Sequence, residues 1–289
     1  MMLRTLALLL LLPGLAWGQE LRVAAVNGPL AYFARALGGA AVEVYFPVPD
    51  GVDPASWRPT IAEIAEYQKS DLILLNGAGY AGWTTKAALP RAKTVDTGKA
   101  LEDRLIMLNS AVTHSHGADG EHSHTGVASQ TWLDLDQATT QAAAVAEALR
   151  RRLPDRAEAI SAAETDLVAA LAERHKRAQE LGAQLVGARL IASLPGLEYF
   201  ARAYGLDIAP LAWTPGQAPG PDDLEALDAA LPARLFVWQE APDAAARAAV
   251  AERGLAQAVA NPGSVAAADF LAVIDSNLDA LEAAVSASE

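Results

Sequence analysis

Short apolar segments that alternate with helical segments are the feature that most constrains this fold. Asp71 to Asn76 (DLILLN) is the plainest example, because uninterrupted apolar character is typical of a parallel strand buried on both faces. Leu21 to Val26 and Val42 to Val48 are two further β-prone runs. Helical spacing over 30–37 and 60–70 lies between them. This strand–helix–strand order predicts βαβ units and a parallel sheet.

The same alternation restarts in the C-terminal part of the chain. Between the two parts, residues 134–181 are rich in Ala, Glu and Arg, and Pro154 interrupts them, which predicts two helices, the second from Asp155 to about Leu181. We therefore expect an α/β fold with two lobes, each a mostly parallel sheet flanked by helices, joined by one long linking helix. The predicted C-terminal strands are 189–193, 234–239 and 256–260, and the predicted helices are 196–204, 222–230, 244–253 and 267–286.

The first 18 residues have the pattern of a signal peptide. Arg4 precedes an apolar run from Leu6 to Leu12, and Ala16-Trp17-Gly18 supplies small residues for cleavage before Gln19. The run is shorter than the roughly 20 residues that a membrane span needs, so we expect no membrane insertion. The sequence has no Cys, so neither a lipid at the cleavage site nor a disulfide can form. We expect an unlipidated protein secreted into a periplasm.

The predicted division of the chain is therefore a signal peptide over 1–18, an N-terminal lobe over 19–154, a linking helix over 155–182 and a C-terminal lobe over 183–289. The formal net charge is −13 and there is no block of Lys or Arg, which argues against nucleic acid or an anionic membrane as partner. No Gly-x-Ser-x-Gly motif is present, and Gly77-Ala78-Gly79 lacks the third glycine of a dinucleotide site. We expect no enzymatic activity, no catalytic cofactor and a monomer.

A polar, Gly- and His-rich stretch without periodicity lies within 109–130, where we expect a mobile loop. Its four histidines form two His-x-His pairs that can chelate zinc, nickel or copper, and zinc is the preferred candidate. The other interpretation is a polar linker whose histidines are incidental. The fifth histidine, His175, is predicted to lie on a solvated, charged helix face. The predicted metal ligands are His114, His116, His122 and His124.

Several short motifs follow one another over nearly the whole mature chain: Gly51-Val52-Asp53-Pro54, the strand 71–76 with Gly77, Trp132-Leu133-Asp134, Tyr199-Phe200-Ala201-Arg202 with Tyr204-Gly205-Leu206, and Asn277-Leu278. Their order and spacing resemble one family, the rigid-helix (cluster A-I) solute-binding proteins of zinc and manganese ABC importers. The resemblance implies a permease and an ATPase as partners, and it implies that the His-rich loop is an accessory metal site.

The chain departs from that family at the metal ligands that the resemblance implies. The three positions where the family has His carry Ala55, Gln130 and Leu194, and the position of its carboxylate best matches Asn261. Ala and Leu offer no donor atom, and amide oxygens are weak zinc ligands. We therefore expect no His cage between the lobes.

Other residues are then the candidates for the cleft between the lobes, and Trp57, Trp132, Trp213 and Trp238 are either aromatic walls or core. Three functions remain open: an importer subunit that captures metal mainly through the His-rich loop, a binding protein of the same fold for a small molecule, metal chelate or oxyanion, and a periplasmic interaction or metal-chaperone protein. The candidate cleft residues are Asp53, Trp57, Gln130, Ser193, Glu240 and Asn261.

Overall fold

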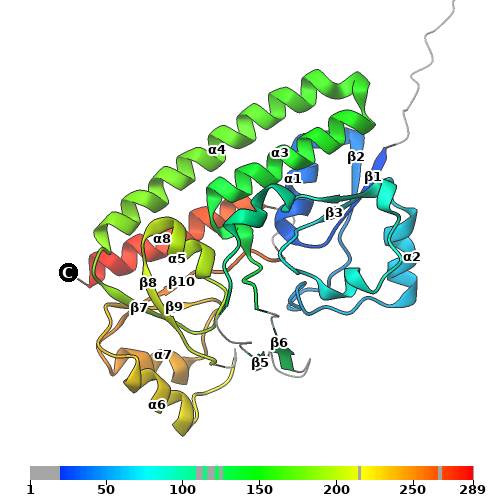
Figure 1. Cartoon of the computed structure of the whole chain (residues 1–289). Helices are drawn as coiled ribbons and strands as arrows, with labels where there is room; N and C mark the ends of the chain where they lie inside the picture. The colour runs from blue at the N-terminus through cyan, green and yellow to red at the C-terminus, as the bar shows by residue number, and fades with distance from the viewer. Residues whose placement is uncertain are drawn as a thin grey trace, which may run out of the picture.

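The computed structural model describes residues 20–108, 113–115, 121–123, 126–213, 216–265 and 269–288, so the predicted signal peptide lies outside the described residues. Figure 1 shows two α/β lobes side by side, with long helices running above both. Each lobe contains a four-stranded sheet, ordered β2-β1-β3-β4 in the first and β10-β9-β7-β8 in the second. Every neighbouring pair in both sheets is parallel, which confirms the predicted fold class.

The strands of the first sheet are β1 Leu21–Ala25, β2 Val42–Tyr45, β3 Leu72–Leu75 and β4 Thr94–Asp96. Those of the second sheet are β7 Arg189–Ala192, β8 Asp207–Pro210, β9 Leu235–Trp238 and β10 Ala256–Val259. Strands β4 and β8 were not predicted from the sequence. Both lie at a sheet edge, where one side of the strand is unpaired and a strong apolar pattern is not needed. Pro210 at the end of β8 also weakens its strand signal.

The helices begin and end close to the predicted positions. Asn27 accepts a hydrogen bond from the Leu30 amide at the start of α1, and Thr60 forms a capping box with Glu63 at the start of α2. Pro154 separates α3 from the long helix α4, as predicted. The helices are α1 Gly28–Gly38, α2 Ile61–Lys69, α3 Leu135–Arg152, α4 Ala157–Gln184, α5 Glu198–Tyr204, α6 Pro221–Ala229, α7 Ala244–Ala251 and α8 Phe270–Ala287. Among the described residues, no helix is both long and apolar enough to cross a membrane.

The second sheet shows how alternating side chains divide between two hydrophobic clusters. Leu190 and Ala192 of β7 join the larger cluster, whereas Ile191 between them joins a smaller one with Phe236 and Trp238 of β9. Side chains alternate between the faces of a strand, so the sheet is covered by apolar side chains on both faces. The larger cluster continues through α4 and α8 into the first sheet, so the two lobes share one core.

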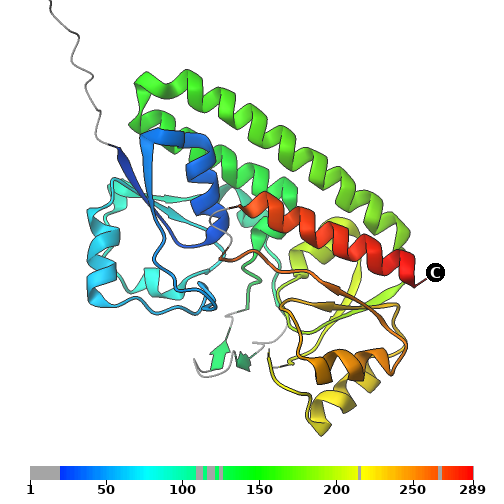
Figure 2. The same ribbon diagram turned by 180° about the vertical axis from the view of Figure 1, so that it is seen from behind.

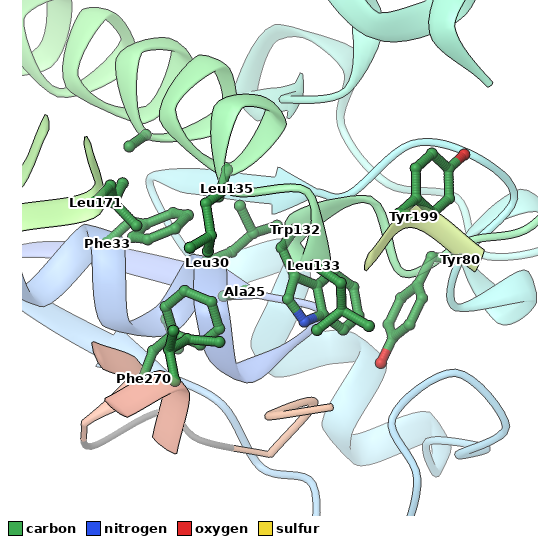
Figure 3. Packing of buried hydrophobic residues seen from close by; sticks show 14 of the residues in the cluster. Ala25, Leu30, Phe33, Tyr80, Trp132, Leu133, Leu135, Leu171, Tyr199 and Phe270 are labelled. Carbon is green, nitrogen blue, oxygen red and sulfur yellow. The ribbon is translucent and has the colours of Figure 1, made fainter. Parts of the chain in front are cut away.

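The helical layer joins the lobes. Figure 2 shows α8 lying along α4 over the second lobe. The first residue of α8, Phe270, meets Phe33 of α1 edge to face, with ring centroids 5.7 Å apart, and Leu171 of α4 lies beside them in Figure 3. Ion pairs from Arg174 to Asp275 and from Arg177 to Glu282 also connect α4 with α8. The relative position of the lobes is therefore set by apolar packing as well as by the chain connections.

A close backbone contact beside α4 gives a test of this arrangement. A Cβ at buried Gly182 would lie 2.2 Å from the carbonyl oxygen of Tyr204, which ends α5. We expect Gly182→Ala to lower the free energy of unfolding by about 2 kcal/mol, although Ala is the better helix former, because backbone atoms must move apart. Urea denaturation measures the difference. The control is Gly82→Ala, where nothing lies within 4 Å and the change should stay within about 0.5 kcal/mol; equal effects of the two variants would contradict the packing argument.

Candidate functional site

A pocket with a volume of about 350 Å³ lies between the two lobes. The second lobe contributes the segments that follow the carboxyl ends of β7, β9 and β10, the edge where ligands of parallel α/β sheets commonly bind. The first lobe contributes the turn after β2 and the segment before α3. The lining residues are 51–54, Leu108, 128–130, 194–196, Glu198, 239–241, 261–262 and 264–265.

Three of the positions at which the resemblance implies metal ligands converge on this pocket. Gln130, Leu194 and Asn261 line it, and Ala55 directly follows the lining pair Asp53-Pro54. The fold therefore brings these positions together from both lobes, but with side chains that have no imidazole. Among the described residues, no group of three or more His, Asp or Glu side chains is arranged to hold a metal ion.

Four of the six predicted cleft residues line the pocket: Asp53, Gln130, Glu240 and Asn261. The Oδ1 atom of Asp53 accepts a hydrogen bond from the Ala55 amide at 3.0 Å, which fixes the carboxylate in a turn. Asn261 is fixed by Asn277 of α8, whose Oδ1 accepts from the Asn261 amide at 2.9 Å and whose Nδ2 donates to its carbonyl at 2.6 Å.

The other two predicted cleft residues, Trp57 and Ser193, are not among the residues that line this pocket. The Trp57 ring packs against Tyr67 and Trp83 in the first lobe, with only 9% of the residue exposed, because a large apolar ring is stabilised more by burial. Ser193 is buried, and its Oγ accepts a hydrogen bond from the Gln239 amide at 3.1 Å.

The other three tryptophans considered for the cleft are also core residues. Trp213 and Trp238 belong to the smaller hydrophobic cluster of the second lobe. Trp132 is fully buried and its Nε1 donates to the carbonyl of Pro262 at 2.7 Å, which ties the first lobe to the loop after β10. Figure 3 shows Trp132 beside Tyr80, whose ring centroid lies 5.3 Å away. Burial, together with the nearby Asp53 carboxylate, raises the pKa of the Tyr80 hydroxyl well above its usual value, so it stays neutral.

The polar lining residues that were not predicted from the sequence include Glu198 and Gln239. The Oε1 atom of Glu198 accepts from the Gly196 amide at 3.0 Å, and Nε2 of Gln239 donates to the carbonyls of Leu194 and Pro195. The available signal was position. Gln239 is the last residue of the predicted strand 234–239, and Glu198 lies near the start of the predicted helix that follows the strand 189–193, so both lie near the carboxyl edge of a parallel sheet. Neither Glu198 nor Gln239 is at a position where the resemblance implies a metal ligand.

The side-chain amide of Gln130 lies close to Gly196 of the second lobe. A Cβ at Gly196, where φ is +120°, would lie 3.0 Å from both terminal atoms of the Gln130 amide. The absence of a side chain at residue 196 therefore leaves space for this amide. Its Oε1 atom is buried and has no hydrogen-bond partner among the described residues. A buried acceptor without a partner costs about 1–3 kcal/mol, so a ligand that donates a hydrogen bond there would recover that energy.

The His-rich stretch emerges from the wall of the pocket. Leu108 donates to the carbonyl of Gly126 at 2.8 Å, and Ala128 donates to that of Ile106 at 2.9 Å, so the two ends of the stretch pair with each other. The hydroxyl of Tyr199, from α5, donates to the carbonyl of Ala128 at 3.0 Å and anchors this pair to the second lobe.

Within the stretch, the structure has two short antiparallel strands, β5 Thr113–Ser115 and β6 Glu121–Ser123, in place of a loop without regular structure. Their register pairs His114 with His122. Figure 1 shows this hairpin below the junction of the lobes. His116 and His124 lie outside the described residues.

The interpretation of His175 as part of a solvated charged face was incomplete. Its Nδ1 lies 3.2 Å from the hydroxyl of Tyr204, and the centroids of the two rings are 5.5 Å apart. That hydroxyl also accepts from the amide of Leu135 at the start of α3. His175 therefore helps to join α4, α5 and α3, away from the pocket.

A buried amide network positions the wall of the pocket in the first lobe. Asn76 follows β3 and is 1% exposed; its Nδ2 donates to the carbonyl of Ser129 at 2.9 Å. Its Oδ1 accepts from Asn27 and from Gln141, each at 3.1 Å. Both ends of the amide are thus used, and the segment 129–130 is held against the sheet.

A two-lobed α/β fold with a pocket at the junction of its lobes is the architecture of a ligand-binding protein, and comparisons with known proteins agree. Residues 23–284 match the model of the family described as zinc-uptake complex component A, periplasmic (ZnuA). The chain therefore belongs to this family, as the sequence resemblance indicated.

The chain is also similar to individual family proteins. It is 25% identical over 198 residues to the manganese ABC transporter substrate-binding lipoprotein PsaA of Streptococcus anginosus, covering 66% of this chain and 62% of PsaA. It is 25% identical over 234 residues to the iron ABC transporter substrate-binding lipoprotein MtsA of Streptococcus pyogenes serotype M1, covering 77% and 73%. The match thus spans less than two thirds of the length of PsaA.

Solved structures show the same fold. The Zn(II)-bound ZnuA-like domain of AdcA from Streptococcus pneumoniae superposes with a TM-score of 0.75 at 17% identity, covering 92% of this chain and 99% of that domain. The solute-binding protein FpvC of Pseudomonas aeruginosa in complex with Mn²⁺ gives a TM-score of 0.71 at 19% identity, covering 94% and 100%.

Replacing Asn76 tests the amide network. In Asn76→Asp the carboxylate faces the Ser129 carbonyl without a cation, so we expect a loss of about 3 kcal/mol or more in stability at pH 7. Burial should raise the carboxyl pKa in the folded state above its unfolded value of about 3.9. The folded state then binds a proton more readily, so the deficit relative to wild type should shrink as pH falls from 7 to 5. Chemical denaturation at both pH values measures this, with exposed Gln217→Glu as control; a deficit that does not change with pH would contradict the argument.

Proposed function

We propose that this protein is the substrate-binding component of an ABC importer for a divalent transition metal and that the His-rich stretch supplies the metal ligands. The single observation that supports this most is the distribution of histidine. The pocket between the lobes has no histidine among its described lining residues, whereas four of the five histidines of the chain lie within 114–124. Neutral imidazole is the main ligand that this sequence, which has no Cys, can offer to zinc.

The register of the hairpin supports this assignment. β5 and β6 pair His114 with His122, so two of the four histidines come from opposite strands at the same level. The ends of the stretch are held by hydrogen bonds to each other and to Tyr199, which reduces the chain entropy lost when a metal binds. We propose His114, His116, His122 and His124 as the ligands and zinc as the metal.

The relatives support the wider role. PsaA and MtsA are named as substrate-binding proteins of manganese and iron ABC transporters, and such a protein needs a permease and an ATPase as partners. We propose that this chain is exported to the periplasm through cleavage after Gly18 and acts as a monomer of two lobes, over 19–154 and 183–289, with 155–182 as the linking helix. It differs from these lipoproteins because its sequence has no Cys for lipid attachment.

Removing the imidazoles tests the proposed ligands. In a variant with His114, His116, His122 and His124 all replaced by Ala, we expect zinc affinity to fall at least tenfold, because two or more ligands are lost from the metal. Competition against a fluorescent chelator measures the affinity. His175→Ala is the matched control, since that side chain contacts Tyr204 away from the hairpin, and it should bind zinc as the wild type does.

The same assignment predicts a pH dependence. Imidazole has a pKa of about 6.5 and its protonated form cannot bind metal, so zinc affinity should fall roughly tenfold or more between pH 7.5 and 5.5.

Unchanged zinc affinity in the four-histidine variant would falsify the role of the stretch. The same would follow from a crystal structure with zinc held between the lobes.

A further inference from the structure

The pocket between the lobes is large for a single metal ion. Its volume is about 350 Å³. Pockets for small organic molecules begin at about 300 Å³. A bare ion needs several donor atoms within about 2.0–2.6 Å, and the described residues contain no group of three His, Asp or Glu side chains so arranged. The dimensions therefore suit a molecule.

The charge of the pocket indicates the sign of the charge on that molecule. Three carboxylates line it, those of Asp53, Glu198 and Glu240, and none of its described lining residues is Lys, Arg or His. An anion or an anionic chelate would meet like charge without a compensating cation, which opposes binding. A cation would be attracted by all three groups.

The polar atoms of the pocket select hydrogen-bond donors. The hydrogen bonds that fix the first two carboxylates use Oδ1 of Asp53 and Oε1 of Glu198, and a carboxylate has about four lone-pair sites, so acceptor capacity remains. The Oε1 atom of Gln130 is an independent sign of a missing donor, because it is buried without a partner among the described residues. A ligand with several N–H groups would match these acceptors.

The absence of aromatic side chains narrows the class of cation further. No Trp, Tyr or Phe is among the described lining residues of the pocket. Quaternary ammonium compounds, which have no N–H group, are recognised mainly by aromatic faces. Primary amines and guanidinium groups instead form charge-assisted hydrogen bonds with carboxylates.

We propose that the pocket between the lobes binds a small organic cation that carries primary-amine or guanidinium groups. Asp53, Glu198 and Glu240 bind its positive groups, and Oε1 of Gln130 accepts one of its N–H hydrogens. This binding goes beyond the proposed metal capture, because it uses other residues and no imidazole.

Isothermal titration calorimetry of the purified protein with defined probes tests the proposal. Putrescine, with two primary amines, and agmatine, with an amine and a guanidinium group, should each bind saturably at one site. Tetramethylammonium, which is cationic without N–H groups, and succinate, which is anionic, should bind at least tenfold more weakly. If neither amine binds, or if succinate or tetramethylammonium binds as well as they do, the proposal is wrong.

Charge-neutralising variants locate the site. Glu198→Gln and Asp53→Asn keep the oxygen that accepts from Gly196 or Ala55, so circular dichroism should show unchanged folding. Each should weaken binding of the better amine roughly tenfold, since a charge-assisted hydrogen bond is lost. The matched control is Glu225→Gln on the exposed surface of α6, which should bind as wild type does. Equal affinity in all three variants would place the amine elsewhere and overturn the proposal.

The four-histidine variant separates this proposal from metal capture. It should keep wild-type affinity for putrescine or agmatine while losing zinc. Loss of amine binding in that variant would contradict a site made by the pocket residues. Retained zinc binding in the same variant would count only against the metal ligands.

Discussion

The continuous hydrophobic core that α4 and α8 share with both sheets is the constraint on which the rest of the structure depends. Phe270 at the start of α8 meets Phe33 of the first lobe, while later residues of α8 pack on the second sheet. Separating the lobes would expose this apolar surface to water, at a cost that grows with its area. The pocket is lined by loops of both lobes, so the packing that fixes the lobes relative to each other also affects the size of the pocket.

Polar contacts then fix the details of the pocket within that frame. The Trp132 indole donates to Pro262 across the junction, and the Tyr199 hydroxyl donates to the carbonyl of Ala128. The Asn76 amide holds Ser129 from the opposite side. Each of these side chains is buried, where an unmade hydrogen bond is costly, so the contacts permit few alternative positions of the wall.

Much of this architecture follows from sequence pattern, and the exceptions have physical causes. DLILLN predicts a central parallel strand because only burial on both faces favours such a run, and Pro154 separates two helices because proline lacks an N–H group. The edge strands β4 and β8 have no comparable pattern. The convergence of Gln130, Leu194 and Asn261 is predictable only through the family resemblance. The presence of Glu198 and Gln239 in the pocket depends on which side chains turn toward it, and local spacing does not determine this. The burial of Trp57 depends on a tertiary contact with Tyr67, which local spacing does not reveal either.

The positions where the resemblance implies imidazoles carry amide and aliphatic side chains, which would change the force that drives binding between the lobes. In a cage of imidazoles, selectivity comes from direct coordination bonds and a fixed geometry. In this pocket, the interactions available to a ligand are the electrostatic attraction of three carboxylates and hydrogen bonds to oxygen acceptors. These interactions act over a longer range than coordination bonds and tolerate a larger ligand. They distinguish ligands by charge and by the pattern of hydrogen-bond donors, but they do not distinguish one metal from another. In the proposed function, metal coordination falls to the four histidines of 114–124. The residues Leu108 and Ala128, at the paired ends of this stretch, are themselves part of the pocket wall.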